Sequence, residues 1–186
     1  MNGSGANVAG CGSCHGRCCR EYRVQVNVAD VRLLAAGTTL HPRQFLRLHD
    51  SGGPDGFHLN PGGNGMELHL LRNPTTGACV FLMELGPELA RCGVYEHRPM
   101  VCRNFPTTLE RGAVAVRTEV KCGPDAWNLA TMDLCTYRQD LVRAVADRVA
   151  HSRAVKAWND RIDGGSQTAD VNELYDHVLT YAPEPA

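Results

Sequence analysis

The sequence predicts an α+β protein in which a small cysteine-rich core with short strands is followed by C-terminal helices. The first observation is the crowding of cysteines, because eight of the nine lie between residues 11 and 122. The second is a set of short apolar segments bounded by turn residues, which is typical of strands. The third is a change after residue 137, where apolar side chains recur at helical spacing.

Before the predicted strands, the chain contains one clear helix signal. In residues 27–37, Asn27 can cap a helix and Gly37 can end it. Pro42 stands where the first turn of a further helix tolerates proline. Residues 51–65 are rich in Gly, Pro, Asn and Asp, and this composition predicts a loop.

Three segments predict short strands: MELHLLR at 66–72, ACVFLM at 78–83 and AVAVRTEV at 113–120. The first two are joined by NPTTG at 73–77, which reads as a turn. Because the segments are short, any sheet is expected to be small.

Two amphipathic helices are predicted at the C-terminus. Their apolar stripes consist of Leu141, Val145, Val149, Val155, Trp158 and Ile162, and then of Val171, Leu174, Val178 and Tyr181. We expect both stripes to pack against other elements. The expected organisation is one domain overall, with a mobile N-terminus at residues 1–10, a cysteine-rich metal-binding core at 11–136, and helices packed on that core at 137–186.

Composition excludes several classes of partner. The net charge is −1, from 19 basic and 20 acidic residues, which gives no electrostatic footprint for nucleic acid or an anionic membrane. The N-terminal residues lack the basic and apolar regions of a secretory signal, so we expect a cytoplasmic protein with reduced thiols. Nine reduced cysteines indicate metal binding. If the protein were secreted, a disulfide framework would be the alternative interpretation.

The cysteines begin with CGSCHGRCCR at residues 11–20, a dense run that we expect to form turns and no regular structure. In extended backbone, the adjacent Cys18 and Cys19 would point to opposite sides, which favours two centres, or one centre and one core position. Eight thiolates divide into two four-thiolate sites, so we expect one or two centres. The expected metal ligands are Cys11, Cys14, Cys18, Cys19, Cys79, Cys92, Cys102 and Cys122. Cys135 is left over and is expected to be a small buried hydrophobe.

Several other side chains can contribute to such a centre. Arg98 and Arg103 flank Cys102 in an otherwise apolar stretch and can offset the thiolate charge. Tyr95 can donate a hydrogen bond near the metal. His15 and His97 lie among the cysteines, where each is either a ligand or an ordinary exposed imidazole, and the other six histidines have no partner at ligand spacing.

These motifs resemble the YkgJ-like CxxCxxCC family of small zinc- or iron-chelating proteins, over about residues 11–125. The matching positions are Cys79, Phe81, Leu82, Cys92, Tyr95, Arg98, Pro99, Cys102, Arg103 and Pro106. Two positions depart from the family pattern: the first motif has one extra residue before its third cysteine, and Val94 replaces an isoleucine. The cysteine module is also similar to that of flagellin lysine N-methylases, where it is associated with an iron–sulfur cluster.

The residues and the resemblance together favour a metal-binding protein. Scattered single cysteines suit an iron–sulfur cluster of the 4Fe–4S type, with zinc as the alternative cofactor. The leading function is cluster binding for electron transfer, with a protein or small-molecule partner. Two other classes stay open: a metal-dependent enzyme that modifies a peptide or small molecule by oxidation or methyl transfer, and a structural zinc protein that acts as an interaction module.

Overall fold

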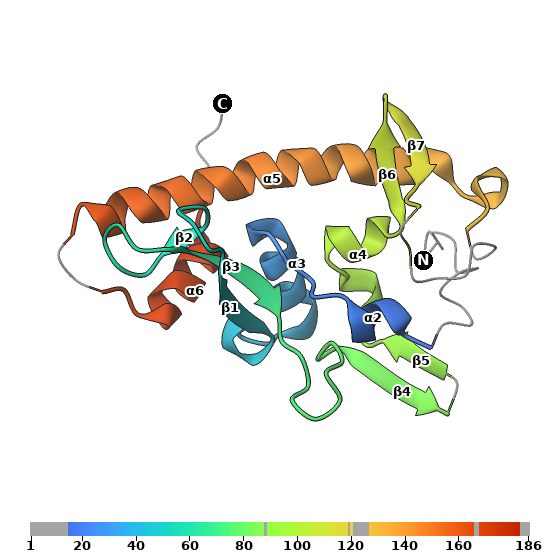
Figure 1. Cartoon of the computed structure of the whole chain (residues 1–186), viewed down its shortest axis with the longest axis horizontal. Helices are drawn as coiled ribbons and strands as arrows, with labels where there is room; N and C mark the ends of the chain where they lie inside the picture. The colour runs from blue at the N-terminus through green and yellow to red at the C-terminus, as the bar shows by residue number, and fades with distance from the viewer. Residues whose placement is uncertain (1–14, 88, 119, 121–126, 166–167, 183–186) are drawn as a thin grey trace. The chain divides into compact units, whose positions relative to one another are not determined.

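The computed structural model describes residues 15–87, 89–118, 120, 127–165 and 168–182. It confirms the α+β class, since short antiparallel strands precede the C-terminal helices (Figure 1). Among the described residues, no helix combines the length and the apolar character needed to cross a membrane.

The chain forms two compact units, each assembled from two segments distant in sequence. One unit, here called the cysteine unit, consists of Met1–Arg23 and Arg72–Ala144. The other, here called the apolar unit, consists of Val24–Leu71 and Val145–Ala186. The chain passes from one unit to the other near residues 24, 72 and 145.

The apolar unit contains a three-stranded antiparallel sheet with the order β1-β3-β2. Its strands are β1 (Leu46–Asp50), β2 (Phe57–His58) and β3 (Gly65–Leu70). Its helices are α3 (Val28–Thr38), the 3-10 turn η1 (Pro42–Gln44), the later turns of α5 (Leu134–Asp163), and α6 (Val171–Thr180). The sequence predicted β3 well, but it missed β1 and the short β2 inside the expected loop.

Helix α3 begins where the sequence predicted. The Asn27 side chain accepts a hydrogen bond from the Asp30 amide (2.9 Å), and the Asp30 carboxylate accepts one from the Asn27 amide (3.1 Å). This reciprocal capping box fixes the first turn. The helix continues past Gly37 and ends at Thr39, which adopts the left-handed conformation with φ 59°.

This unit holds the main apolar core of the described chain. Its largest fully buried side chains are Trp158, Phe45, Phe57, Leu34, Leu68, Leu174, Val31, Val178 and Pro42. The stripe of α6 and the end of α5 therefore pack as predicted. Farther back along α5 the prediction is wrong, because Val145 and Val149 are 46% and 50% exposed.

The cysteine unit contains two separate hairpins and several short helices. The hairpins are β4 (Leu82–Gly86) with β5 (Leu89–Cys92), and β6 (Thr107–Glu110) with β7 (Ala113–Val116). The helical segments are α2 (Arg17–Glu21), η2 (Tyr95–His97), α4 (Met100–Asn104), η4 (Leu129–Thr131) and the first turns of α5.

The turn predicted at residues 73–77 is present, since the Gly77 amide donates to the Asn73 carbonyl (2.8 Å) and the Asn73 amide to the Ala78 carbonyl (2.7 Å). The strands on either side of it, β3 and β4, belong to different sheets. The predicted third strand is β7, and its partner β6 was not foreseen. Arg111 and Gly112 join the two with φ values of 50° and 82°, as a two-residue type I′ turn requires.

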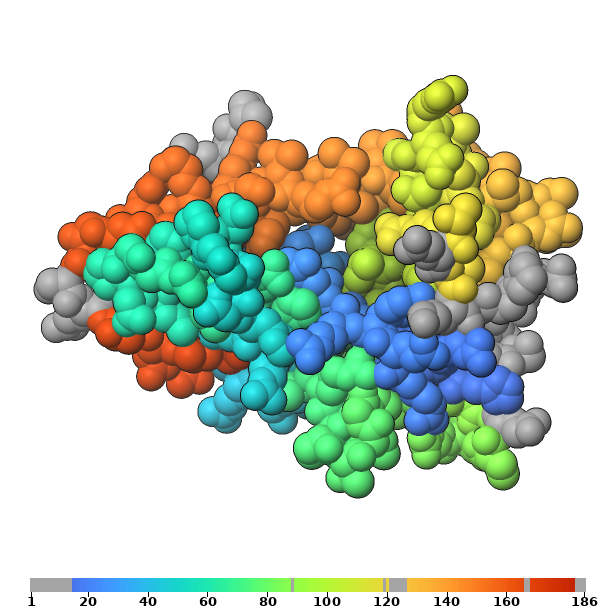
Figure 2. All heavy atoms as spheres, viewed as in Figure 1, coloured from blue at the N-terminus to red at the C-terminus, as the bar shows by residue number. Residues whose placement is uncertain are grey.

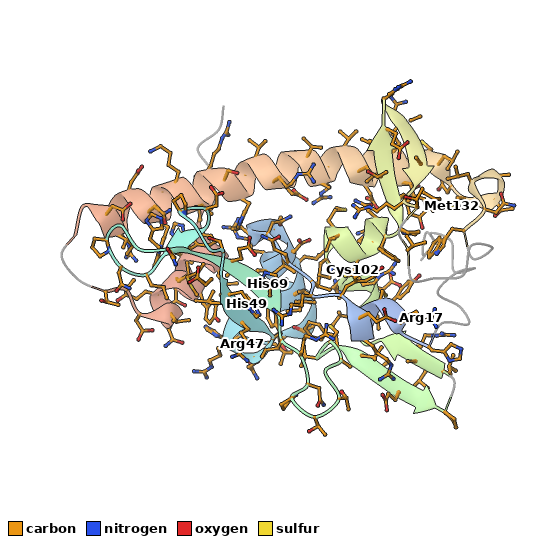
Figure 3. The ribbon with its side chains drawn as sticks, viewed as in Figure 1. Arg17, Arg47, His49, His69, Cys102 and Met132 are labelled. Carbon is orange, nitrogen blue, oxygen red and sulfur yellow. The ribbon has the colours of Figure 1, made fainter. Side chains whose placement is uncertain are left out.

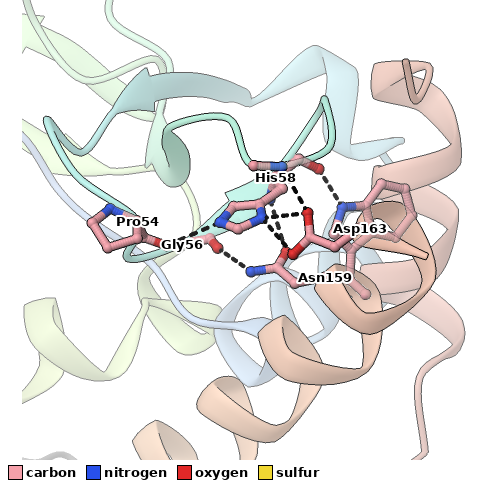
Figure 4. A network of polar contacts seen from close by, with 7 residues as sticks. Pro54, Gly56, His58, Asn159 and Asp163 are labelled. Carbon is pink, nitrogen blue, oxygen red and sulfur yellow. Dashed lines mark hydrogen bonds and ion pairs between the residues drawn. The ribbon is translucent and has the colours of Figure 1, made fainter. Parts of the chain in front are cut away.

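A polar network ties the loop around β2 to the last turns of α5 (Figure 4). His58 Nδ1 lies 3.0 and 3.1 Å from the two Asp163 carboxylate oxygens, and His58 Nε2 lies 3.1 Å from the Pro54 carbonyl. Both partners only accept hydrogen bonds, so both ring nitrogens of this buried His58 must donate. The Asn159 side chain adds bonds from the His58 amide (2.8 Å) and to the Gly56 carbonyl (2.9 Å).

We expect this network to make stability depend on pH in a defined direction. The hydrogen bond to Asp163 raises the pKa of His58 above its ordinary value, against the opposing effect of burial. The imidazolium therefore stabilises the fold fully below the ordinary histidine pKa, and the contribution is lost as pH rises through the raised one. The pKa of Asp163 is lowered, first by the Gly62 amide and then by His58, so its own contribution is lost only in acid.

The variant His58→Gln should melt about 2–4 °C below wild-type protein near pH 6. The difference between the two melting temperatures should shrink as pH rises through the raised pKa of His58, because the wild-type imidazolium then loses its charge. His151 and His177, whose rings lie near Phe57, are present in both proteins and cancel in the comparison. A difference that stays constant or grows with pH would show that His58 is not held as imidazolium.

Candidate metal centre

The adjacent pair Cys18 and Cys19 lies on helix α2, which corrects the expectation of irregular or extended backbone at this point. Because the pair is helical, its two Sγ atoms lie 3.9 Å apart and share a hydrogen bond. The geometric reason for sending the two thiols to different centres therefore does not apply.

Gly16 allows α2 to lie on the β4–β5 hairpin, as the space-filling view also shows (Figure 2). It has φ 69°, and a Cβ atom there would lie 2.6 Å from Leu82 Cδ1 and 3.3 Å from the Ala90 methyl group. A larger residue would be strained in conformation and would push the helix away from the hairpin. Arg20 adds an ion pair with Glu84 of β4 (2.6 Å).

Three further cysteines come from separate segments of the same unit. Cys79 follows the turn after β3, and its amide donates to the Cys19 carbonyl (2.7 Å). Cys92 is the last residue of β5, paired with Leu82. Cys102 lies on α4, where its amide donates to the Pro99 carbonyl (2.9 Å) (Figure 3). All five thiols are free and half-buried.

The five thiols interact electrostatically. The hydrogen bond from the Cys19 thiol lowers the pKa of Cys18 to about 7 despite burial, and the same bond raises the pKa of Cys19. Burial raises the pKa of Cys79 and Cys92, and that of Cys102 most strongly.

Four of these thiols, Cys19, Cys79, Cys92 and Cys102, also respond to the charge of others in the group. The pKa of Cys102 is raised further by the charges of Cys18, Cys79 and Cys92. That of Cys19 is raised by the charges of Cys18, Cys79 and Cys102. The cysteines therefore form one electrostatic group and not a set of isolated side chains.

Arg98 is the predicted cation that faces this group. Its guanidinium lies 3.8 Å from the centroid of the Tyr95 ring, and its Nε donates to the Tyr95 carbonyl (3.1 Å). Its charge lowers the pKa of Cys18, Cys92 and Cys102. Tyr95 thus holds the Arg98 side chain in position, through both its ring and its backbone carbonyl.

Arg103 is placed differently from Arg98. Its guanidinium donates to the Asp140 carboxylate of α5 (3.2 Å), which is a partly buried ion pair. None of the pKa shifts described for the five cysteines has Arg103 among its causes. The partner of Arg103 is therefore the Asp140 carboxylate, whereas the charge of Arg98 acts on the thiols.

No sequence motif points to Arg72, yet its charge lowers the pKa of Cys79. Its two terminal nitrogens donate to the carbonyls of Tyr22 (2.6 Å) and Arg20. The role of Arg72 becomes visible only from its bonds to backbone carbonyls that are distant in the sequence, so a sequence motif could not have indicated it.

The predicted ligands Cys11, Cys14 and Cys122 lie outside the described residues. Cys135 lies at the start of α5 and is exposed, in contrast to the buried position expected from the sequence. The Gln139 amide lies 3.7 Å from its sulfur atom. Among the histidines of the motifs, His15 is exposed and His97 is half-buried.

Antiparallel pairing also brings together histidines for which the sequence offered no partner. The rings of His49 on β1 and His69 on β3 lie 4.7 Å apart, and His69 Nε2 lies 2.9 Å from Glu67 (Figure 3). This group belongs to the apolar unit and does not include any cysteine.

The donor set fits a thiophilic metal in its chemistry, because five soft sulfur ligands gather beside cationic side chains. In the described part of the chain, no group of three or more His, Cys, Asp or Glu side chains is arranged to hold one metal ion. Around tetrahedral zinc, with Zn–S distances of about 2.3 Å, neighbouring sulfur atoms lie about 3.8 Å apart. The Cys18–Cys19 pair, at 3.9 Å, has that separation.

Comparison with known protein families identifies the motif region. A protein-family model named CxxCxxCC, with the description "Putative zinc- or iron-chelating domain", matches residues 10–125, more than half of the chain. No curated protein and no solved structure matches the chain.

We expect the described cysteines to differ sharply in their effect on metal content. Cys135→Ser should retain the metal content of wild-type protein, because Cys135 is exposed and outside the electrostatic group. Cys92→Ser, in the matched test, should lose metal because it removes a thiolate from the group. Elemental analysis per chain measures both. Loss of a full equivalent in Cys135→Ser, or none in Cys92→Ser, would contradict this assignment.

Proposed function

We propose that this chain, which belongs to the CxxCxxCC family of zinc- or iron-chelating domains, holds iron in a thiolate-ligated iron–sulfur cluster. The described residues that would ligate it are Cys18, Cys19, Cys79, Cys92 and Cys102. Cys11, Cys14 and Cys122 complete the proposed set of ligands. A 4Fe–4S cluster takes four thiolates, so eight cysteines suffice for one centre or for two.

The observation that carries the proposal is the arrangement of the five described thiols. They come from four segments and act on one another electrostatically, yet no three of them converge on one ion. A cluster contains several iron and sulfide atoms, so its thiolates lie farther apart than those around a single ion. It also collects ligands from several loops, as the separation of Cys79, Cys92 and Cys102 along the chain requires.

Charge supports the same proposal. Several half-buried thiolates repel one another and are costly to desolvate. Arg98 and Arg72 place positive charge beside Cys18, Cys92 and Cys79, which offsets part of that cost. Hydrogen bonds and charges near the sulfur atoms also set the reduction potential of such a cluster.

In this proposal the centre serves electron transfer in the cytoplasm, with a protein or small-molecule partner. A cluster of this kind supplies one-electron chemistry when bound. The chain's own residues bind it, orient it through α2, β5 and α4, and tune its charge through Arg98. The near-neutral composition supports a partner other than nucleic acid or a membrane.

Zinc is the second candidate, and one distance favours it. The separation of 3.9 Å between the Cys18 and Cys19 sulfur atoms equals that of two thiolates on one tetrahedral zinc ion. Such a site would need its other ligands from elsewhere in the cysteine unit.

Protein purified without oxygen under iron-replete conditions should contain iron and inorganic sulfide. It should be brown, with a broad charge-transfer absorption that bleaches on reduction. Iron, zinc and sulfide are measured per chain, and Cys135→Ser serves as the control that keeps the colour. A colourless protein with stoichiometric zinc and no sulfide would refute the cluster and establish the zinc alternative.

A further inference from the structure

Arg72 links two segments that carry proposed ligands. It stands just after β3 and forms an antiparallel bridge with Cys79 across the turn at residues 73–77. Its Nη1 donates to the Tyr22 carbonyl (2.6 Å), and its Nη2 donates to the Arg20 carbonyl. One guanidinium therefore binds the chain at the end of α2 while its own backbone pairs with Cys79.

The two carbonyls are at the C-terminal end of α2, where helix carbonyls lack partners within the helix. Cationic side chains are favoured at this end because the unsatisfied carbonyls carry partial negative charge. Arg72 satisfies both carbonyls with a planar fork of donors. Lysine has the same charge, but it is a compact point charge and cannot reproduce that fork.

Burial contributes little to holding α2 in place, although Arg20 also forms an ion pair with Glu84 of β4 (2.6 Å). The helix has five residues, and none of their side chains is buried. The Cys79 amide donates to the Cys19 carbonyl (2.7 Å), which is a second link between the same two segments. Together these bonds fix the separation of Cys18 and Cys19 from Cys79.

We infer that Arg72 is a positioning residue of the metal centre, which holds the Cys18–Cys19 helix at a fixed distance from Cys79 by bridging the Arg20 and Tyr22 carbonyls. This inference rests on the proposed role of these cysteines as ligands. Arg72 acts through the backbone of α2 and does not itself touch the metal. Its charge beside Cys79 is a second, smaller contribution.

The test compares Arg72→Lys and Arg72→Gln with Arg17→Gln. Arg17 is the matched control because it is an exposed arginine of α2 beside Cys18, and its ion pair with Glu21 (3.7 Å) stays within the helix. Metal-free protein is titrated with Co²⁺, whose thiolate charge-transfer absorption reports sulfur ligation. Both Arg72 variants should bind Co²⁺ about tenfold more weakly than wild-type protein. Arg17→Gln should stay within about twofold, as expected for an exposed charge.

Hydrogen exchange supplies a readout that does not depend on affinity. At saturating Co²⁺, the amides of Cys79 and Tyr22 should exchange faster in both Arg72 variants than in Arg17→Gln. The amides of the β6–β7 hairpin, in the same unit as Arg72, report whether a variant is folded, and they should stay protected in all proteins. If Arg72→Gln unfolds, Arg72→Lys, which keeps the charge, decides the question.

Two outcomes would overturn the inference. Wild-type Co²⁺ affinity and exchange in Arg72→Lys would show that only charge matters, and unchanged exchange of the Cys79 amide in both variants would show that Arg72 does not hold α2. Failure of the proposed function looks different: wild-type protein would bind neither Co²⁺ nor iron nor zinc through sulfur. The exchange rates, measured then without metal, would still decide whether Arg72 holds α2.

Discussion

The constraint on which the cysteine unit depends is its shortage of apolar side chains to bury. Within the described chain, the large fully buried aromatic and aliphatic side chains belong to the apolar unit, whereas the cysteine unit contributes Pro99, Pro106 and Thr107 to the same class. One buried cluster of this unit is Trp127, Met132 and Tyr137, which packs against side chains of β7 and η4. Two small hairpins and five-residue helices are marginal without further support. Metal ligation would supply that support, as it does in small metal-stabilised domains.

Local signals explain what the sequence predicted well. Asn27 and Asp30 cap α3 through hydrogen bonds between residues three positions apart. Strand β3 is recognised from the sequence of apolar and polar residues along it. The hairpin partner β6 was missed because TTLE has little apolar alternation of its own and is fixed by pairing with β7. Val145 and Val149 fit a helical stripe, yet periodicity says only that side chains share a face. It does not say that another element covers that face.

The candidate site shows the same division between local and distant causes. The ligand motif is visible because cysteine spacing is local, and Arg98 is visible because it lies within that motif. The helical conformation of Cys18 and Cys19 could not be predicted from the sequence, because HGRCCRE has no apolar periodicity. That conformation depends on the contact of Gly16 with Leu82 and Ala90, which are distant in the sequence. Arg103 belongs to the same motif as Arg98, but its side chain binds Asp140 on helix α5. Arg72 is recognised only from the carbonyls that it binds.

The pKa shifts of the thiols support the proposed metal centre, as does the sparse apolar packing of the cysteine unit. Burial raises the pKa of Cys79, Cys92 and Cys102, so these thiols are neutral unless something compensates their charge. Neutral thiols are weak hydrogen-bonding groups, so they would contribute little free energy to hold the four segments together. A bound cation or cluster reverses this balance, because it stabilises the thiolates and joins the segments at once. The cationic side chains then act on a charge that only the metal-bound state develops in full. The scarcity of apolar packing and the gathering of ionisable sulfur are therefore both accounted for by the proposed centre, whose ligands would hold the cysteine unit together.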